Sequence, residues 1–401
     1  MQPFDIHIPT RIFFGTQKAD VFAEALAGLG RHAFVVLGGG SVEKLGFYSQ
    51  VTDLLDRKNI RHTTFRGIEP NPHAGTVNKA ARLGKDAGVD FVLAFGGGSV
   101  MDASKAIAGL IHEDEEDIWP YVLGGAKHNT MAGALPVATI PTTAATASEV
   151  TMHAIISKPD VQGKAPVSYP FLKPAVSWLN PAFHTSLPLE TTRDGASDIL
   201  SHIFENYLLG GNDSPLADRY SEGVMETVMT TLPLVEKDPG NENLRGDLLW
   251  ASTMALLGLQ QSGRTPAPFR MHNLEHALSG YNPDLAHGRG LATIYPAYFR
   301  WLNREGRLQD RLAQLGHRLF DIAPSGDRET DALSFITAFE QWLRDNGLYQ
   351  PLSDVGVPEK AFGGIADYAL ETYGDGQQLD VDGPLTRDGI IEIFEMTEMQ
   401  G

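Results

Sequence analysis

The sequence predicts an α/β protein in which a parallel-sheet region precedes an all-helical region, and two patterns carry this prediction. Up to about residue 180, apolar β-rich runs such as AFVVLGGG (33–40) and VDFVLAFGGG (89–98) are each followed by a segment of helical spacing. Strands that are apolar on both faces and lead into helices are typical of a buried parallel sheet. After Pro188, strand-like runs become scarce and apolar residues recur three and four positions apart, as in amphipathic helices.

The individual elements follow from local runs. We expect a first strand ending at Gly15 and further strands in the ranges 33–40, 89–98, 134–143, 150–157 and 175–181. Helices are expected in 41–59 and 99–111, and long amphipathic helices in 218–237, 243–263 and 330–348. The change of pattern predicts a boundary between residues 181 and 190, which gives an α/β domain at 1–185 and a helical domain at 186–401. A cleft between two such domains is a common place for a ligand.

Composition limits the partners and the kinds of metal site. The chain has 32 basic and 50 acidic side chains, a net charge of −18, which argues against nucleic acids and anionic membranes as partners. It has no cysteine, so any metal must be held by histidines and carboxylates. No apolar run approaches the ~18 residues of a membrane span, and the first residues lack the pattern of a signal peptide. We therefore expect a cytoplasmic protein.

The sequence GGGSV occurs twice, at 38–42 and at 96–100, each time between a predicted strand and a predicted helix. Glycines permit a sharp turn, and the free N–H groups of a helix start can hold a phosphate, although a turn without a ligand is equally reasonable. Neither turn is the G-x-G-x-x-G fingerprint of dinucleotide-binding folds. The second turn continues as SVMDASK, which places Asp102 and Lys105 on the first turns of the helix, where Lys105 could offset the charge of Asp102.

The predicted helical region contains two pairs of metal-ligating side chains. Asp198 and His202 are four residues apart, as are His272 and His276, and residues at this spacing share one helix face. His287 follows shortly after. Either pair alone is usually structural, but together Asp198 and two or three of the histidines could bind one divalent ion. One carboxylate with several imidazoles suits Fe²⁺ or Zn²⁺ better than Mg²⁺ or Ca²⁺.

Five motifs in order resemble the iron-containing (group III) alcohol dehydrogenases, and most of all their butanol dehydrogenase and broad-range aldehyde reductase branch. They are GGGSVMDASK (96–105), IPTTAATASEVT (140–151), DILSH (198–202), HNLEH (272–276) and AHGRGLA (286–292). The resemblance extends from the N-terminal strand to about residue 390. It implies the dehydroquinate synthase-like fold of that family, with a Rossmann-like dinucleotide-binding domain, a helical metal- and substrate-binding domain, the metal between them, and a homodimer.

The resemblance also implies roles for single residues. Asp198, His202, His272 and His287 match the metal ligands of the family, whereas His276 matches a histidine of the substrate pocket that does not bind the metal. His276 is therefore the candidate catalytic residue, able to relay a proton because imidazole titrates near neutral pH. The expected cofactor contacts are Gly38, Gly39, Gly40, Ser41, Gly97, Gly98, Ser99, Asp102, Thr142, Thr146 and Lys164.

The first glycine turn bears on the choice of cofactor. Family members that prefer NAD tend to carry an acidic residue there, whereas Gly40-Ser41 resembles the branch that uses NADP, so we expect NADP, with NAD possible. Glu43 opposes this expectation, because it stands where a basic residue would hold the 2′-phosphate. Two more departures from the family are Asn180, where Asp is common, and a connection between His276 and His287 that is about one residue longer.

The implied activity is hydride transfer between a nicotinamide and a primary alcohol or aldehyde, with Fe²⁺, Zn²⁺ or another divalent ion as Lewis acid. A polyol dehydrogenase and a hydroxyacid–oxoacid transhydrogenase remain alternatives with the same fold. A dehydroquinate-synthase-like lyase would need a more basic pocket than the motifs provide. A protein that only binds nucleotide or metal is the alternative of a different class, and the intact candidate ligands argue against it.

Overall fold

The structure of the chain, a computed structural model, describes residues 1–379 and 385–399. The chain forms two compact units. One comprises residues 7–187 together with 238–253, and the other comprises residues 1–6, 188–237 and the chain from Met254 onward. The predicted order of an α/β region and a helical region is confirmed. Residues 238–253 group with the α/β unit, although the sequence pattern assigns them to the helical domain.

A six-stranded sheet forms the centre of the α/β unit, with the strand order β1-β8-β5-β4-β2-β3 and every neighbouring pair parallel. The strands are β1 (Arg11–Phe14), β2 (His32–Leu37), β3 (Arg61–Phe65), β4 (Phe91–Gly96), β5 (Val137–Pro141) and β8 (Val176–Leu179). The strand predicted at 150–157 is β6 (His153–Lys158), which does not join this sheet and pairs antiparallel with β7 (Gly163–Ser168).

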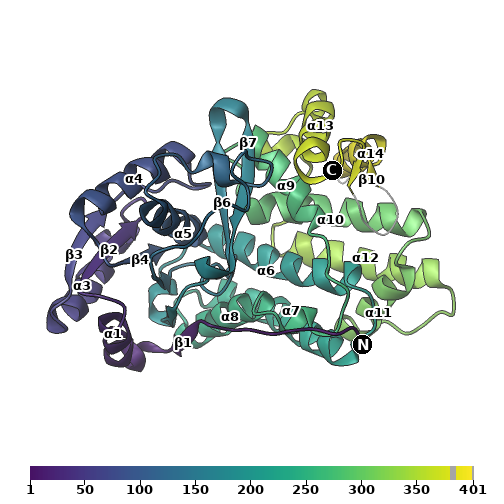
Figure 1. Ribbon diagram of the computed structural model, residues 1–401. Helices are drawn as coiled ribbons and strands as arrows, with labels where there is room; N and C mark the ends of the chain where they lie inside the picture. Colours follow the sequence, from purple (N-terminus) through teal and green to yellow (C-terminus); the bar gives the residue numbers. More distant parts are fainter. Residues whose placement is uncertain (380–384, 400–401) are drawn as a thin grey trace. The chain divides into compact units, whose positions relative to one another are not determined.

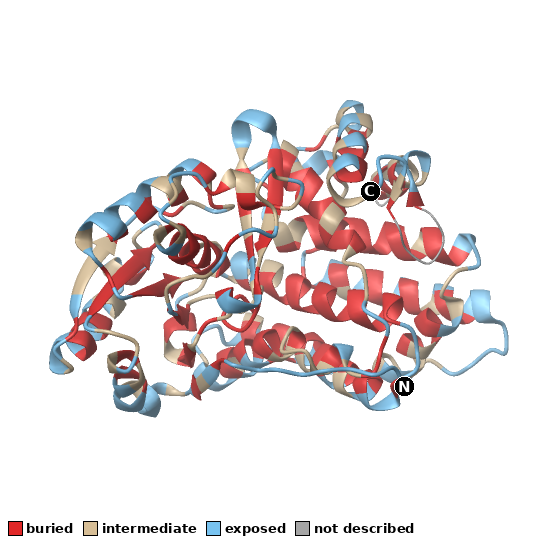
Figure 2. Ribbon diagram, viewed as in Figure 1, coloured by how far each residue is buried: buried red, intermediate tan, exposed pale blue. Residues whose placement is uncertain are grey.

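Both faces of the sheet are covered, because side chains of alternate strand residues enter two separate cores. Phe34 and Val92 belong to one core, and Val35 and Leu93 to the other. Helices α4 (Ala74–Ala87) and α5 (Gly98–Glu113) contribute to the first core, and α1 (Ala19–Ala27) and α3 (Phe47–Arg57) to the second. Figure 2 shows β2 buried along its length, as the apolar run predicts.

The carboxyl ends of β5, β4 and β2 lie at one edge of the sheet, because these strands are neighbours and parallel. The two glycine turns follow β2 and β4, and the 141–149 segment follows β5. In open parallel sheets this is the edge at which ligands bind. The turns differ in what comes next, because α2 (Ser41–Lys44) is a single helical turn, whereas α5 is a sixteen-residue helix.

The second unit consists mainly of helices, several of which run side by side in Figure 1, as α6, α10 and α12 do. Its long elements are α6 (Leu189–Leu209), α7 (Pro215–Lys237), α9 (Arg270–Tyr281), α10 (His287–Arg304), α11 (Gln309–Leu319), α12 (Arg328–Asp345), α13 (Phe362–Tyr373) and α14 (Arg387–Glu398). Helix α8 (Glu242–Ala255) ends where the chain returns from the α/β unit, and β9 (Gln378–Leu379) pairs with β10 (Leu385–Thr386). Within the described ranges, no helix has the length and apolar character to cross a membrane.

Candidate functional site

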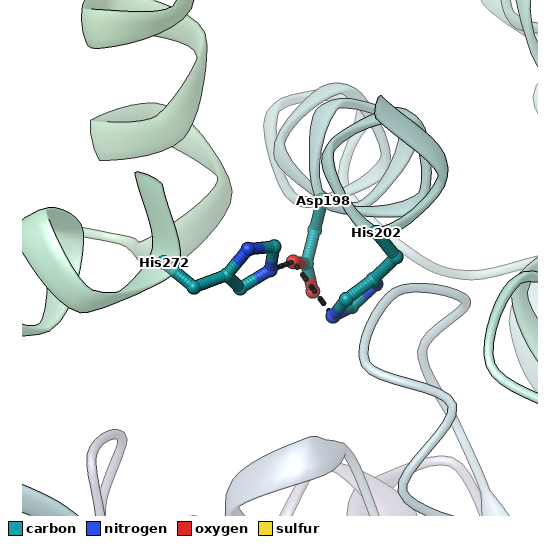
Figure 3. A group of neighbouring side chains, drawn as sticks. All are labelled: Asp198, His202 and His272. Carbon is teal, nitrogen blue, oxygen red and sulfur yellow. Dashed lines mark ion pairs between the residues drawn. The ribbon is translucent and has the colours of Figure 1, made fainter. Parts of the chain in front are cut away.

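Three helices of the second unit bring together the four side chains that the family motifs mark as metal ligands. Helix α6 carries Asp198 and His202 one turn apart, α9 carries His272, and α10 begins at His287. Figure 3 shows the rings of His202 and His272 pointing at the carboxylate of Asp198 from the two helices. As the four-residue spacing predicts, the side chains of Asp198 and His202 lie on one face of α6.

The distances fit a metal ion better than a set of hydrogen bonds. Asp198 Oδ1 lies 3.7 Å from His202 Nε2 and 3.6 Å from the Nε2 atoms of both His272 and His287. These separations exceed a hydrogen bond, and within the described chain neither Asp198 Oδ1 nor His272 Nε2 has a hydrogen-bond partner although both are buried. Ligand atoms bound tetrahedrally at roughly 2.1 Å are about 3.4 Å apart, close to the spacing observed. The residues therefore fit a divalent ion.

The charges within this cluster favour ligation. Burial by itself raises the pKa of Asp198, but His202, His287 and His272 outweigh it and hold that pKa below its ordinary value, so the carboxylate is ionised. Burial lowers the pKa of His272, yet its contacts with Asp198 and Glu205 more than compensate and raise it to about 9. A proton held among these groups competes with a cation for the same nitrogen, which couples metal binding to proton release.

Gly288 explains how His287 reaches Asp198. A Cβ atom at Gly288 would lie 1.8 Å from the backbone carbonyl oxygen of Asp194 on α6, so only glycine allows α10 to start this close to α6. The contact is reinforced by Arg289, whose Nε donates to Asp194 Oδ1 at 2.8 Å. The AHGRG motif thus places a candidate ligand, the close approach of two helices and an ion pair in consecutive residues.

His276 is buried beside His287, and its Nδ1 faces α13. Its Nδ1 is 3.4 Å from the hydroxyl of Tyr373 on α13, and its ring stacks on that of His287 at a centroid distance of 5.3 Å. The close pair in HNLEH is therefore divided, since His272 faces Asp198 and His276 faces Tyr373. The connection to His287 comprises residues 282–286, shorter than the SGYNPDLA stretch suggests, because Ser279–Tyr281 still belong to α9.

Two buried carboxylates at this site were not identified from the sequence. Glu205 on α6 accepts hydrogen bonds from the backbone of α9 and contacts the ring of His272, and Glu275 on α9 contacts the ring of His287. Glu205 stands seven residues after Asp198, two helical turns along the same face, which is the signal that could have drawn attention to it. Glu275 lies inside HNLEH, and only the two histidines of that motif were considered as functional residues.

The predicted cofactor residues lie in the α/β unit, mostly at the carboxyl edge of the sheet. Gly38, Gly39, Gly40 and Ser41 follow β2, Gly97, Gly98 and Ser99 follow β4, and Thr142 follows β5. Gly98 begins α5 and has Thr146 against it, where a Cβ would meet the threonine side chain at 2.5 Å. Ser99 Oγ accepts a hydrogen bond from the backbone of Asn71. A phosphate at this edge would meet the amino terminus of α5.

Asp102 and Lys105 form a buried polar network with the segment after β5. Asp102 accepts from Ser148 Oγ at 2.5 Å and from the backbone N of Ile155 at 2.9 Å, while Lys105 Nζ donates to Ser148 Oγ at 2.7 Å. Lys105 Nζ lies 3.9 Å from Asp102, in line with a charge-offsetting role, and burial lowers the pKa of Lys105 to about 8. Lys164 is buried on β7 and interacts electrostatically with Asp102.

Two residues that depart from the family pattern have defined contacts in the structure. Asn180 Oδ1 accepts hydrogen bonds from the backbone of Ala182 and the hydroxyl of Thr16, so it caps the 3₁₀ helix that begins at Pro181. Glu43 is paired with Arg66, whose Nε donates to it at 2.9 Å. The acidic charge near the first glycine turn is thus accompanied by a guanidinium from the end of β3.

Comparisons with known proteins identify the family of the chain. Residues 9–181 match the family "Iron-containing alcohol dehydrogenase", and residues 192–397 match "Fe-containing alcohol dehydrogenase family, C-terminal". The chain is 31% identical to NADH-dependent butanol dehydrogenase A of Clostridium acetobutylicum over 98% of this chain and 99% of the relative. It is 32% identical to the NADPH-dependent aldehyde reductase YqhD of Escherichia coli, with the same coverage of both chains.

Solved structures give the same result. The crystal structure of an NADH-dependent butanol dehydrogenase A from Thermotoga maritima superimposes with a TM-score of 0.92 at 32% identity, covering 99% of each chain. That of YqhD from Escherichia coli has a TM-score of 0.91 at 30% identity, again over 99% of each chain. The predicted fold, family and oxidoreductase class are confirmed, and the chain belongs to the iron-containing alcohol dehydrogenase family.

Proposed function

We propose that this protein is an NAD(P)-dependent alcohol dehydrogenase and aldehyde reductase whose divalent ion is held by Asp198, His202, His272 and His287. The observation that carries the proposal is the convergence of three imidazole Nε2 atoms on one buried carboxylate oxygen at 3.6–3.7 Å. Three imidazoles and one carboxylate suit Fe²⁺ and accept Zn²⁺ as well, and availability decides which ion is bound. When bound, the ion acts as a Lewis acid toward the oxygen of the alcohol or aldehyde.

His276 is proposed as the residue that moves a proton to or from the substrate oxygen. It lies next to the ligand set, with its ring on that of His287, yet its Nδ1 faces the Tyr373 hydroxyl. That contact gives the imidazole a hydrogen-bonding neighbour that can hold its orientation while the opposite ring nitrogen serves the reaction. The alternative is a pocket-wall residue whose removal leaves turnover unchanged.

The cofactor is proposed to bind at the carboxyl edge of the sheet, through the two glycine turns and Ser99, with Asp102, Thr142, Thr146 and Lys164 as further contacts. Open parallel sheets bind dinucleotides at this edge, and α5 offers free N–H groups to a phosphate. NADP is favoured because Gly40 and Ser41 themselves carry no carboxylate to repel a 2′-phosphate, and because the nearby carboxylate of Glu43 is paired with Arg66. Substituting Arg66 with Ala should lower the ratio of NADPH to NADH efficiency several-fold. An unchanged ratio would show that Arg66 does not contribute to the choice between NADPH and NADH.

The proposed substrates are primary alcohols and the corresponding aldehydes. Support comes from relatives named butanol dehydrogenase and aldehyde reductase, which match nearly the whole chain. A polyol dehydrogenase and a transhydrogenase with the same fold remain the second candidates. A homodimer and a cytoplasmic location stay predictions, the former to be tested by light scattering.

A spectrophotometric screen tests the proposal. Butanal, longer aldehydes and polyols are offered with NADPH and with NADH, before chelation, after chelation, and after each metal is added back. We expect aldehyde reduction that disappears on chelation and returns with Fe²⁺ or Zn²⁺. Full activity in demonstrably metal-free protein would refute the proposal, and co-purified nicotinamide with no external cofactor requirement would favour the transhydrogenase.

A further inference from the structure

The buried cluster contains two groups of potential ligands, and the groups adjoin. Asp198, His202 and His272 form one, and Glu275, His276 and His287 form the other, each with its ligand atoms within 4.8 Å of one another. His287 connects them, because its Nε2 lies 3.6 Å from Asp198 while its Nδ1 contacts Glu275. Either the second group holds an ion of its own, or Glu275 serves the first group through His287.

Glu205 contacts Nδ1 of His272, just as Glu275 contacts Nδ1 of His287. Its Oε1 accepts hydrogen bonds from the backbone N of Met271 at 2.6 Å and of His272 at 3.1 Å, and lies 3.4 Å from His272 Nδ1. The side chain of Glu205 is almost completely buried, with 1% exposed. The carboxylate therefore fixes both the first turn of α9 and the ring that this turn carries.

These carboxylate contacts determine which nitrogen of each imidazole carries the proton. A neutral histidine has one protonated nitrogen and one with a lone pair. A carboxylate that accepts a hydrogen bond from Nδ1–H keeps the proton on Nδ1 and leaves the lone pair on Nε2. In both His272 and His287 the Nε2 atom is the one that faces Asp198. Histidines that bind metals usually donate their other N–H in this way, which sets the tautomer and raises ligand basicity.

Space for Glu275 comes from α10. A Cβ atom at Gly290 would lie 2.8 Å from Cγ and 3.0 Å from Oε1 of Glu275, so the glycine leaves room for the carboxylate beside α10. Gly288 and Gly290 thus serve two purposes in one motif. The first admits the close approach of α10 to α6, and the second admits the carboxylate that contacts His287.

The charges of the cluster favour one bound ion with Glu205 and Glu275 beside its histidines. Asp198, Glu205 and Glu275 are three buried carboxylates in one cluster, and buried charges must be compensated. A divalent ion offsets two of the three charges. Arg270, which is buried and attracts Glu205 electrostatically, offsets the third. His287 Nδ1 already contacts Glu275, so this nitrogen is not open to a second ion while that contact persists.

We propose that Glu205 and Glu275 are positioning residues that hold His272 and His287 as Nε2 ligands of a single ion. The proposal rests on the ligand set proposed above. It names two residues outside that set, and it assigns the Glu275–His276–His287 group to the support of the first site and not to a second metal.

Chelator competition with Zn²⁺ measures the effect without an activity assay. Purified full-length protein and its Glu205→Ala and Glu275→Ala variants are titrated against a chromophoric chelator. Each Ala variant should bind Zn²⁺ about 10- to 100-fold more weakly. Glu205→Gln and Glu275→Gln should recover part of the loss, because the amide oxygen accepts the same hydrogen bond. Glu340→Gln is the control, since Glu340 is a buried carboxylate of the same unit that pairs with Arg300.

A glycine substitution guards against variants that fail to fold. Gly290→Ala keeps every carboxylate but crowds Glu275, so it should weaken Zn²⁺ binding by a smaller factor. Gly364→Ala is its matched control, because a Cβ at Gly364 on α13 meets nothing within 4 Å and should leave affinity unchanged.

The outcomes separate this inference from the proposed function. A wild-type protein that binds no ion overturns the proposed function itself. A wild-type protein that binds one ion, with folded Ala and Gly290→Ala variants of equal affinity, overturns only the positioning role. Two ions per chain, one of them lost in Glu275→Ala, would make Glu275 a ligand and contradict the inference.

Discussion

The helical unit contains two buried clusters built around an aspartate, and they are completed in different ways. Asp218 on α7 accepts from Arg264 at 2.5 Å and from both terminal nitrogens of Arg311 at 2.8 and 2.9 Å, so both of its oxygens are paired. Asp198 on α6 has three imidazoles around it at 3.6–3.7 Å, too far for hydrogen bonds. The first cluster is saturated by the protein, whereas the second leaves space for a cation.

The contacts of the two aspartates distinguish a structural ion-pair network from a proposed metal site when both are buried. Guanidinium groups supply donors that meet a carboxylate directly, and the resulting pairs need nothing further. Imidazoles that stay beyond hydrogen-bonding distance of a carboxylate keep their nitrogen lone pairs free. These lone pairs and the negative oxygen can then point at one cation. Four predictions test whether the two clusters really serve these different purposes.

The largest effect is expected from Asp198→Ala. The variant should lose its bound metal and all measurable alcohol dehydrogenase activity, because the only carboxylate among the proposed ligands is gone. Its circular dichroism spectrum should stay that of a folded protein. Metal analysis after desalting gives the readout. A variant that retains one equivalent of metal would show that Asp198 is not a ligand.

Asp218→Ala should have the opposite profile. Its removal leaves Arg264 and Arg311 buried without their carboxylate, which costs about 3–5 kcal/mol of stability. Urea unfolding of wild type and variant measures the loss. The molecules that remain folded should still bind one equivalent of metal. Loss of metal without loss of stability would reverse the roles assigned to the two clusters.

His276→Ala tests a residue at the border of the Asp198 cluster. Turnover should fall about 100-fold, the low end of the range for a lost proton-transfer group, while metal content persists. Steady-state kinetics and metal analysis on the same preparation provide the comparison. If the metal is lost, His276 is a ligand. If turnover is unchanged, it is a pocket-wall residue.

The smallest effect is a pH dependence confined to the Asp218 cluster. Burial opposes ionisation of Asp218, but Arg311 and Arg264 outweigh it and hold its pKa below the ordinary value of 3.8. The folded state therefore binds fewer protons than the unfolded state just below that value, so this contribution to stability is present above pH 3.8 and is lost as the pH falls through the folded pKa. The stability difference between wild type and Asp218→Asn should be constant from pH 7 to 5 and shrink below pH 4. A difference that already narrows above pH 5 would contradict this account.

The sequence predicted the fold well where burial and periodicity coincide. The strands at 33–40 and 89–98 were recognisable because both of their faces are apolar, and both are central in the sheet. β3 was missed because RHTTF is polar and lies at the sheet edge, where only Phe65 is fully buried. The run at 150–157 was recognised as a strand, but its antiparallel partner β7 was not. Local pattern does not encode which strands pair.

The candidate site was also predicted only in part from the sequence. The i, i+4 spacing of Asp198 and His202 placed two candidate ligands on one helix face. Only the family resemblance separated His272 from His276. Glu205 and Glu275 could not be assigned, because their roles depend on contacts between different helices. Gly288 likewise becomes meaningful only once the Asp194 carbonyl lies against it. Spacing reveals which side chains share an element, whereas the approach of elements decides what those side chains do.

Anomalous diffraction from crystals of the protein loaded with Fe²⁺ or Zn²⁺ would locate the bound ion itself. We expect a single peak at roughly 2.0–2.2 Å from a carboxylate oxygen of Asp198 and from the Nε2 atoms of His202, His272 and His287. A peak coordinated by Glu275 and His276, with Asp198 at hydrogen-bonding distance from its histidines, would contradict this expectation.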